Sequence, residues 1–363
     1  MPSPFALTPR TIKLLIAGIL ILGALSAYRL LLAPPPGPYT SLSGTTMGTT
    51  WSVNVASRDM GPSAMRRTAT AIQTSLDEVV AHMSTWESDS EISQLNRSTT
   101  AEPQALSPLL LDVLRVAQTT SQKSQGAFDI TVSPLVQLWG FGAALPPEEL
   151  PSEKEIEEAR LHTGYGLLVL DEAARTLTKQ DPQIEIDLSA IAKGYGVDRV
   201  AEKLESLGYL DYLVEVGGEL RARGRRLDGK TWRVAIEAPR EGLREIHRVV
   251  ELKDMAMATS GDYRNFYEHD GKRLSHTLDP RTGRPVEHAL ASVSVLHTTA
   301  TAADAWATAM NVLGPENGFQ IAQEEDLAAY FISRSSTDGQ FEVRVTPAFA
   351  RYWPPALEPL ASH

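Results

Sequence analysis

The spacing of apolar residues predicts the helices of this chain. From Ala64 to Met83 the apolar positions recur every three or four residues, which places them on one face of a helix. Ser107 suits the N-cap of a second helix, because its hydroxyl can accept a hydrogen bond from a free backbone N–H. A third helix is expected after Asp187, and a fourth from Ala302 to Leu313 with Thr301 as its cap.

Short stretches that alternate between polar and apolar residues, or that are rich in β-branched ones, predict the strands. They are Leu167–Leu170, Ile184–Asp187, Tyr212–Val216, Trp232–Ile236 and Ala291–Leu296. Helices and strands interleave without a regular β-α-β-α order. We therefore predict an α/β (α+β) fold with mixed sheets and interleaved helices, rather than a doubly wound sheet.

The first 33 residues differ from this pattern. Residues 14–33 form an apolar run that follows two basic residues and no acidic one, which is typical of a segment whose N-terminus stays in the cytoplasm. Residues 14–27 suit the core of a signal peptide. Taken to Ala33, the run can span a bilayer if Arg29 reaches the interface. We favour an uncleaved transmembrane anchor over a signal segment, and in both cases the rest of the chain is exported.

Composition divides the chain further and excludes several classes of protein. Residues 34–43 are a Pro-rich linker, 44–345 the folded domain, and 346–363 a Pro-rich tail expected to lie on the surface. The net charge is −11, and about −14 without the three positive charges of the first 33 residues, which argues against a nucleic-acid partner. Cysteine is absent, which excludes disulfides, thiolate nucleophiles, iron–sulfur clusters and a lipid attached to an N-terminal Cys.

Several common catalytic motifs are missing from the sequence. It contains no G-x-x-x-x-G-K-[ST] phosphate loop, no G-x-S-x-G elbow and no H-E-x-x-H zinc motif. Gly194-Tyr195-Gly196 is an isolated G-x-G inside a helical pattern, too short to indicate a dinucleotide fold. The eight histidines are scattered, with no pair at metal-ligand spacing that also carries a carboxylate. A serine-hydrolase or transition-metal function is therefore not supported.

Several short segments instead combine glycines, hydroxyls and single acids. Taken alone, each has a structural explanation: Asp187 as a helix N-cap, Asp279-Pro280 as the start of a turn, and Gly217-Gly218 as a tight bend. Four of the segments, in their order along the chain, together resemble the ApbE family of FAD:protein FMN transferases. They are A-F-D at 127–129, D-L-S-A-I-A-K-G at 187–194, S-H-T-L-D-P-R-T-G at 275–283 and A-D-A-W-A-T at 303–308. The resemblance covers residues 44–345 and implies an ApbE-like fold.

The resemblance also implies a reaction. A member of this family requires Mg²⁺, cleaves FAD at its pyrophosphate, links FMN by a phosphoester bond to a Thr or Ser hydroxyl of an acceptor protein, and releases AMP. Acceptors are typically exported subunits of membrane redox complexes, such as the sodium-pumping quinone reductase. Together with the N-terminal segment, this places the enzyme on the periplasmic side of the bacterial inner membrane, anchored there or released after cleavage.

A metal site is expected on the fourth predicted helix. Asp304 and Thr308 stand four residues apart, so their side-chain oxygens lie on one face. Such hard ligands suit Mg²⁺, which usually keeps water or phosphate oxygens in its shell. Alternatively, Thr308 only bonds back to its own helix. The resemblance adds the backbone carbonyl of Ala190 as a ligand, and some family members carry a further Asp at the position of Ala307.

Two side chains are candidates for the transfer step itself. Lys193 can place a positive charge against the pyrophosphate, or it is a solvated helix residue. His276 is the natural general base, because an imidazole with an ordinary pKa of about 6.5 accepts a hydroxyl proton at neutral pH. The alternative for His276 is a buried structural histidine.

FAD requires faces for its rings and partners for its polar groups. The rings suit aromatic or apolar side chains, and Ser260 with Gly261 suggests a small-residue turn whose backbone N–H groups approach phosphate. The FAD contacts implied by the resemblance are Met47, Trp86, Ala127, Phe128, Asp129, Asp187, Lys193 and Leu278.

Three other functions stay open. The first is an Mg²⁺-dependent FAD pyrophosphatase, in which water replaces the acceptor hydroxyl and the products are FMN and AMP. The second is a non-catalytic flavin-binding protein, and the third is a membrane-tethered structural protein. AMP release separates the enzymes from the binding protein, and tight FAD binding separates all of them from the structural protein.

Overall fold

The computed structural model describes residues 39–352, apart from 143–146, 148, 241, 243–244, 263–265, 270–271 and 336–339. The expected anchor or signal segment 1–33, the first half of the linker and the last residues of the tail lie outside the described residues. Among the residues that are described, no helix is both long and apolar enough to cross a membrane.

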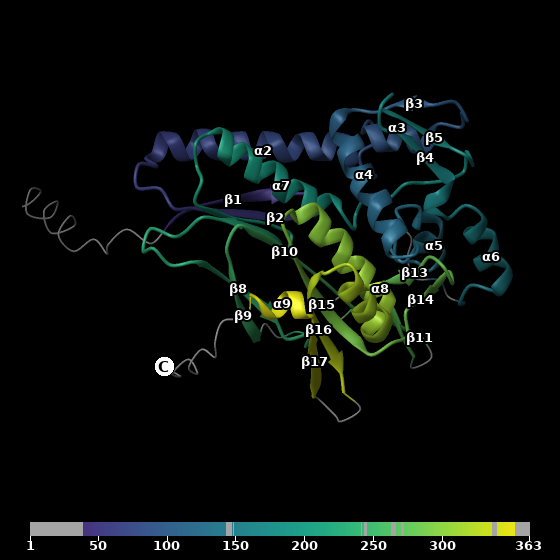
Figure 1. The fold of residues 1–363 in the computed structure, drawn as a ribbon. Coiled ribbons are helices and arrows are strands. Elements are labelled where there is room, and N and C mark those ends of the chain that lie inside the picture. Colours follow the sequence, from purple (N-terminus) through teal and green to yellow (C-terminus); the bar gives the residue numbers. More distant parts are fainter. Residues whose placement is uncertain are drawn as a thin grey trace, which may run out of the picture. The chain divides into compact units, whose positions relative to one another are not determined.

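An eight-stranded antiparallel sheet forms the centre of the folded unit that begins at Thr40 (Figure 1). In sheet order, its strands are β1 (Thr40–Thr46), β2 (Thr49–Val55), β6 (Tyr212–Val216), β7 (Glu219–Arg223), β10 (Met255–Gly261), β15 (Leu290–His297), β16 (Ala328–Arg334) and β17 (Phe341–Val345). β15 is buried from Leu290 to Leu296, which is typical of a central strand covered on both faces.

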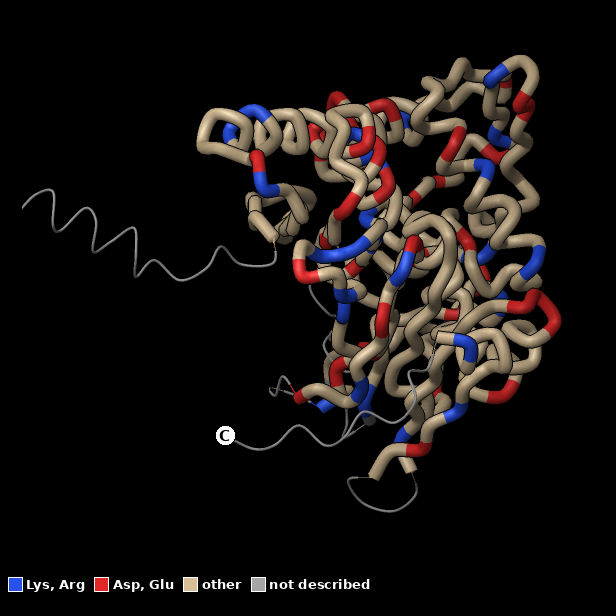
Figure 2. The backbone as a smooth tube through the Cα atoms, turned by 60° about the vertical axis from the view of Figure 1, so that its left-hand side comes forward, with Lys and Arg blue, Asp and Glu red and all other residues tan. Residues whose placement is uncertain are grey.

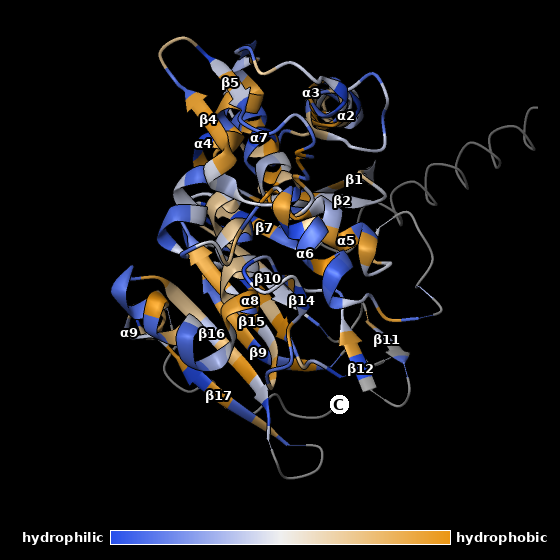
Figure 3. Cartoon of the chain, turned by 90° about the vertical axis from the view of Figure 1, so that its right-hand side faces the viewer, coloured by the Kyte–Doolittle hydropathy of each residue, from blue (hydrophilic) through white to orange (hydrophobic). Residues whose placement is uncertain are grey.

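Three helices cover one face of this sheet: α2 (Pro62–Met83), α7 (Ala192–Ser206) and α8 (Ala300–Glu324). Apolar side chains of α2 and α7, such as Ile72 and Val200, pack against Val53 and Val214 of the sheet. The hairpin of β8 (Trp232–Glu237) and β9 (Ile246–Leu252), together with α9 (Pro347–Ala350), covers the other face. Figure 3 shows the apolar strands of the sheet between these two layers.

A second group of elements lies beside one end of the helical layer (Figure 1). It comprises α3 (Glu91–Arg97), α4 (Pro108–Lys123), α5 (Ser133–Leu138), α6 (Glu153–Leu161), the 3₁₀ turn Tyr165–Leu167 and a small sheet of β3 (Gln104–Ala105), β5 (Thr176–Lys179) and β4 (Leu168–Asp171). Two short hairpins complete the described chain: β11 (Phe266–His269) with β12 (Lys272–Ser275), and β13 (Leu278–Asp279) with β14 (Arg284–Pro285).

Most of the predicted elements are confirmed. The α/β arrangement with interleaved helices is present, α2 matches the helix predicted from Ala64, and β6 matches its predicted strand. The expectation of mixed sheets is wrong, because the strand pairs of the described residues are antiparallel. Ser107 is the N-cap of α4, with its hydroxyl accepting from the backbone N–H of Leu110. Acidic and basic positions are intermixed along the chain in Figure 2.

Three predictions at element boundaries are wrong. Residues 184–187 form no strand, because their backbone groups pair with a side chain and a loop instead. Thr299, not Thr301, is the N-cap of α8. This helix also continues beyond Leu313, with a kink at Gly314, where φ is 79°.

Both ends of the expected domain also shift. Strand β1 begins at Thr40, so residues 40–43 of the expected linker belong to the sheet. At the other end, Thr346 caps α9 and Phe349 is buried, so the first part of the expected tail belongs to the folded body.

Candidate functional site

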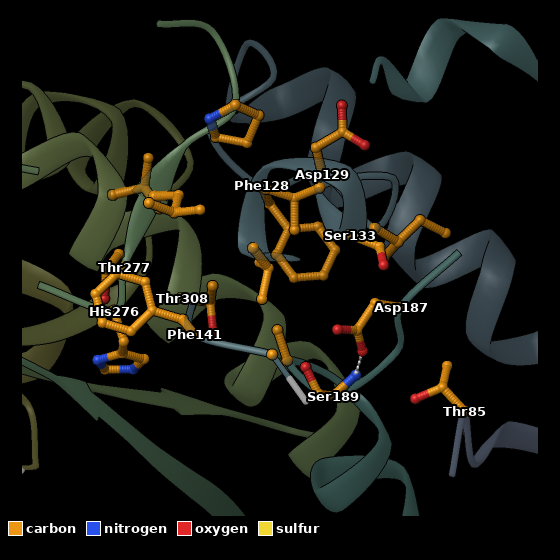
Figure 4. Close-up of a pocket in the computed structure, with 18 of the residues that line it drawn as sticks. Thr85, Phe128, Asp129, Ser133, Phe141, Asp187, Ser189, His276, Thr277 and Thr308 are labelled. Atoms are coloured by element: carbon orange, nitrogen blue, oxygen red, sulfur yellow. Dashed lines mark hydrogen bonds between the residues drawn. The ribbon is translucent and has the colours of Figure 1, made fainter. Parts of the chain in front are cut away.

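One cavity brings together residues from distant parts of the chain. Its volume is about 1270 Å³, and its walls come from α3, the segments around 127–142 and 185–193, β10, the β11–β12 hairpin and α8. Every residue predicted for the site lines this cavity except Met47 (Figure 4). Met47 lines a smaller neighbouring cavity of about 180 Å³, which shares Trp86, Asp187 and Lys193 with the large one.

Three charged side chains form a buried cluster in the cavity wall. Lys193 Nζ lies 2.5 Å from Glu219 Oε1 and 3.9 Å from Asp304 Oδ1. Glu219 and Asp304 are each only 3 % exposed. One ammonium therefore lies near two carboxylates. When all three groups are ionised, the cluster has a net negative charge and attracts a further cation.

The contact between α7 and α8 fixes Asp304 in this cluster. The backbone N–H of Gly194 donates to Asp304 Oδ2 over 3.0 Å. A Cβ atom at residue 194 would lie 2.3 Å from the carbonyl oxygen of Ala300, so only glycine allows the two helices to approach this closely. One turn further along α7, the carboxylate of Asp198 accepts from the backbone N–H groups of Ala300 and Thr301 at the start of α8.

The three groups shift one another's protonation. Burial raises the pKa of Asp304, partly offset by the charge of Lys193. Burial and the charge of Asp304 raise the pKa of Glu219 to about 8, against the opposing effect of Lys193. Burial alone would lower the pKa of Lys193, but the two carboxylates raise it above its ordinary value.

The oxygens beside this cluster fit a hard divalent cation. Thr308 lies one turn after Asp304, and its hydroxyl lies 3.4 Å from the Ser260 hydroxyl rather than against a carbonyl of its own helix. Ala190, just before α7, lines the same cavity. A carboxylate, a hydroxyl and a carbonyl are ligands that suit Mg²⁺. No group of three His, Cys, Asp or Glu side chains in the described part of the chain could hold a metal ion, so a cation here would also need substrate or water oxygens.

The A-F-D segment is more deeply buried than a ligand-binding segment usually is. The ring of Phe128 is only 1 % exposed, so it offers little surface to a flavin or adenine ring. Asp129 already accepts hydrogen bonds on both carboxylate oxygens, from the backbone N–H groups of Thr131 and Tyr165 and from the Thr131 hydroxyl. Burial nevertheless raises the pKa of Asp129. The segment therefore shapes the cavity wall, with Ala127 and Phe128 forming its floor.

Asp187 lies on an irregular segment that other residues hold in place. Its backbone N–H donates to the Ile130 carbonyl over 2.7 Å, and its Oδ1 accepts from the backbone N–H of Ser189 over 2.8 Å, the interaction drawn in Figure 4. The Asn96 side chain both donates to and accepts from the backbone of Ile186. Asp187 thus turns the chain into α7 while its carboxylate faces the cavity.

Trp86 differs from Phe128 in its exposure to solvent. It lies on the loop between α2 and α3, lines both cavities and is 79 % exposed, so it is not part of the core. Trp306, at 6 % exposed, is the core tryptophan. An exposed indole ring at the edge of a cavity is available to stack on a planar ligand. Met47, at the tip of the β1–β2 hairpin with φ 46°, lies against Gly196 of α7.

His276 lies between β12 and β13 and is half-buried in the cavity wall, so it is not a fully buried structural histidine. Its ring is edge-on to Phe141 with centroids 6.5 Å apart, and Phe141 in turn lies 5.0 Å from the ring of Tyr267. Figure 4 shows His276, Phe141, Thr277 and Thr308 on one side of the cavity and Asp187 with Ser189 on another.

The expected turn at Ser260-Gly261 is wrong, because both residues lie on β10. β15 pairs with β10 over Ala256–Gly261, whereas β7 pairs only with Met255–Met257. The backbone of Thr259–Gly261 therefore has one edge that β7 does not cover, and these residues line the cavity there. Leu278, on β13, is buried and contributes an apolar part of the wall.

Sequence reasoning gave no role to Glu219, Phe141 or Tyr267. A signal for Glu219 was present, since this acidic residue directly follows Gly217-Gly218 in a segment recognised only as a tight bend. Nothing in the local sequence marks Phe141 or Tyr267, because their position beside His276 depends on how separate loops pack.

Comparison with known sequences matches residues 47–331 to the ApbE family. An FAD:protein FMN transferase of Haemophilus influenzae is 42 % identical over 315 residues, which cover 86 % of this chain and 90 % of that protein. A protein of the same name from Escherichia coli is 39 % identical, with 86 % and 89 % covered.

Solved structures agree with this match. The flavin transferase ApbE from Vibrio cholerae superposes with a TM-score of 0.78 at 39 % identity, covering 86 % of this chain and 99 % of that one. The apo form of the flavinyl transferase ApbE from Pseudomonas stutzeri gives a TM-score of 0.79 at 37 % identity, covering 88 % and 98 %.

Proposed function

The chain belongs to the ApbE family and is a transferase, and from this premise we propose that it is an Mg²⁺-dependent FAD:protein FMN transferase. It links FMN through a phosphoester to a Thr or Ser hydroxyl and releases AMP. The observation that supports this most strongly is the meeting of Lys193, Asp304, Thr308 and His276, from three separate segments, around one cavity.

The transfer exchanges the phosphoanhydride of FAD for a phosphoester. The acceptor hydroxyl oxygen attacks the phosphorus of the FMN half of FAD, and the bond from that phosphorus to the bridging oxygen breaks. AMP leaves with the bridging oxygen, and the hydroxyl proton is released. Such a reaction needs alignment of the attacking and leaving oxygens, neutralisation of charge and removal of a proton, with little covalent participation by the protein.

Residues of this chain suit each requirement. Lys193, paired with Glu219, supplies a fixed positive charge in the cavity wall. His276, on the more open wall, accepts the hydroxyl proton. Trp86 covers a ring of FAD, and Asp187 accepts hydrogen bonds from its sugar or base donors. Asp304, Thr308 and the Ala190 carbonyl would hold Mg²⁺, which when bound neutralises pyrophosphate charge.

The acceptor and the location follow from the same premise. We infer that the acceptor is an exported subunit of a membrane redox complex, and that the enzyme works on the periplasmic side of the inner membrane, held by residues 1–33 or released after their cleavage. Protease treatment of spheroplasts tests the location. Digestion of the body only after the inner membrane is permeabilised would contradict it.

The test of the activity mixes the full chain, in mild detergent, with FAD, Mg²⁺ and an acceptor domain that exposes a Thr in a loop of small residues. Flavin fluorescence that stays with the acceptor after denaturing electrophoresis, together with an equal amount of AMP, is the expected result. Replacing the acceptor Thr by Val should abolish the fluorescent band. AMP without labelled acceptor would favour an FAD pyrophosphatase, and bound FAD without AMP would favour a flavin-binding protein.

A further inference from the structure

We propose that Glu219 is a positioning residue that holds the Lys193 ammonium away from Asp304, and so keeps the Asp304 carboxylate open to a divalent cation. The inference rests on the proposed function, because it takes Asp304 to be a metal ligand. It assigns a role to the Val216–Glu219 segment, which the transfer step itself does not use.

The distances within the cluster show which carboxylate holds the ammonium. Lys193 Nζ is at hydrogen-bonding distance, 2.5 Å, from Glu219 Oε1, but 3.9 Å from Asp304 Oδ1. In the part of the chain that the structure describes, no other basic side chain forms an ion pair with either carboxylate. The two acids therefore compete for one cation, and Glu219 binds it.

The turn between β6 and β7 is built around Lys193. A Cβ atom at Gly217, where φ is 59°, would lie 3.0 Å from Lys193 Cδ and 3.0 Å from Thr49 Cγ2. Glycine therefore leaves room for the lysine stem to cross the turn. The next residues enter β7, where Glu219 pairs in register with Val216. The turn thus sets the path of the lysine and places its counter-charge at the end of that path.

Glu219 has no second role among the described residues. Its Oε2 is buried and has no hydrogen-bond partner in the described structure, although the residue lines the cavity. An unpaired buried carboxylate oxygen is costly to retain, which favours a function for this charge beyond packing. Lys193 is the group that this charge contacts.

Asp304 is the second carboxylate that the Lys193 ammonium can contact. Its Oδ2 is occupied by the Gly194 N–H, whereas Oδ1 faces Lys193. If residue 219 carries no charge, Asp304 becomes the only anion next to Lys193, and a small rotation of the lysine closes the 3.9 Å gap. An ammonium bonded to Asp304 competes directly with a divalent cation for the same oxygen.

The first test measures Mg²⁺ binding to the full chain without FAD, by titration calorimetry. A pH of about 8.5 is used because it lies above the raised pKa of Glu219, about 8. Glu219→Gln keeps the size of the side chain and removes its charge. We expect it to weaken Mg²⁺ binding by about 10-fold, equivalent to about 1.4 kcal/mol. The matched control is Glu325→Gln, which breaks the Lys123–Glu325 pair at the surface, outside the cavity. The control should bind Mg²⁺ like the wild type.

A double-mutant cycle separates positioning from a direct attraction between Glu219 and the metal. With Lys193→Met, no ammonium can move onto Asp304, so adding Glu219→Gln should change Mg²⁺ affinity by less than about 2-fold. An equal loss of affinity in both backgrounds would overturn the proposal. Circular dichroism verifies that each variant is folded.

A crystal structure of the Mg²⁺-free Glu219→Gln variant provides a readout that does not depend on the double variant. Lys193 Nζ should lie within hydrogen-bonding distance of Asp304 Oδ1. A lysine that keeps its present separation, or that turns into the cavity, contradicts the proposal. If the wild-type protein binds no Mg²⁺, or if the Asp304→Ala variant binds Mg²⁺ as well as the wild type does, the metal site of the proposed function is contradicted instead.

Discussion

The two sides of the cavity are built differently. On one side, Lys193, Glu219 and Asp304 lie on α7, β7 and α8, and the two carboxylates are almost fully buried. Trp86 and His276, called the aromatic side below, lie on two separate connecting segments between regular elements, where Trp86 is mostly exposed and His276 is half-buried.

This difference in burial and in supporting structure assigns the two sides to different tasks, the stabilisation of charge and the binding of substrates. The charged side is fixed before any ligand arrives, because helix contacts and a tight turn leave its groups few alternatives. Such preorganisation is what the stabilisation of developing charge requires. The side with the aromatic residues has fewer constraints, which suits the recognition of a large substrate and a protein acceptor. Changes on the charged side and at His276 should therefore reduce the rate, and changes at Trp86 should mainly reduce binding.

The largest effect is expected from Asp304→Ala. Loss of this carboxylate removes the only charged side chain of the candidate metal site, so transfer of FMN should fall by at least about 10³-fold. Quantified in-gel fluorescence and AMP release measure it. The control is Asp262→Asn, which removes another buried carboxylate, paired with Arg334 and outside the cavity. Comparable activity in the two variants would show that the effect comes from buried charge in general.

His276→Ala tests whether the aromatic side also contributes to the rate. Loss of a general base should lower the transfer rate by about 10²- to 10⁴-fold, while the Kd for FAD changes little. Single-turnover AMP release and FAD titration measure the two quantities separately. His82→Ala, which breaks a half-buried pair with Glu91 outside the cavity, should leave both unchanged. A variant that transfers FMN at the full rate would exclude His276 as the base.

Trp86→Ala should affect binding alone. Loss of a stacking indole should weaken FAD binding by about 10-fold. Because the side chain is 79 % exposed, the free energy of unfolding should change by less than about 0.5 kcal/mol. Fluorescence titration and urea unfolding measure these effects. Leu161→Ala, at an exposed position on α6, is the control and should change neither. A strongly destabilised Trp86 variant would contradict the comparison.

The smallest effect is a dependence of stability on pH at the charged side. The pKa of Glu219 rises from an ordinary 4.5 to about 8 on folding, so the folded protein holds a proton that the unfolded chain releases. This stabilisation is fully present below pH 4.5 and is lost as the pH rises through about 8. In the presence of a chelator, the melting temperature should fall by a few degrees between about pH 6 and pH 9. Glu219→Gln should reduce this slope, and an unchanged slope would assign it to another group.

The sequence predicted those features whose causes are local. The apolar spacing of α2 and the hydroxyl of Ser107 act within a few residues, and both predictions are confirmed. The strand expected at Ile184–Asp187 is wrong because side chains pair with this backbone in place of another strand. The buried Lys179 ammonium donates to the Ile184 carbonyl, and the Asn96 side chain, 90 residues away, accepts from the Ile186 N–H. No local pattern carries that information.

The same division holds for the candidate site. The spacing of Asp304 and Thr308 placed both on one helix face, and the structure has both in the cavity wall. Glu219 stayed without a role because its partner Lys193 lies 26 residues earlier and meets it only through the β6–β7 turn. The exposure of Trp86 and the burial of Phe128 likewise depend on how separate elements pack, so residue type alone did not distinguish them.

The hydrogen bond from Gly194 to Asp304 joins residues that are 110 positions apart in the chain. During synthesis on the ribosome, Lys193, Glu219 and His276 are all made before the first residue of α8. A nascent or truncated chain that ends before α8 thus has the lysine and the histidine, but neither Asp304 nor Thr308. Under the proposed function, a chain that ends before α8 should therefore not cleave FAD.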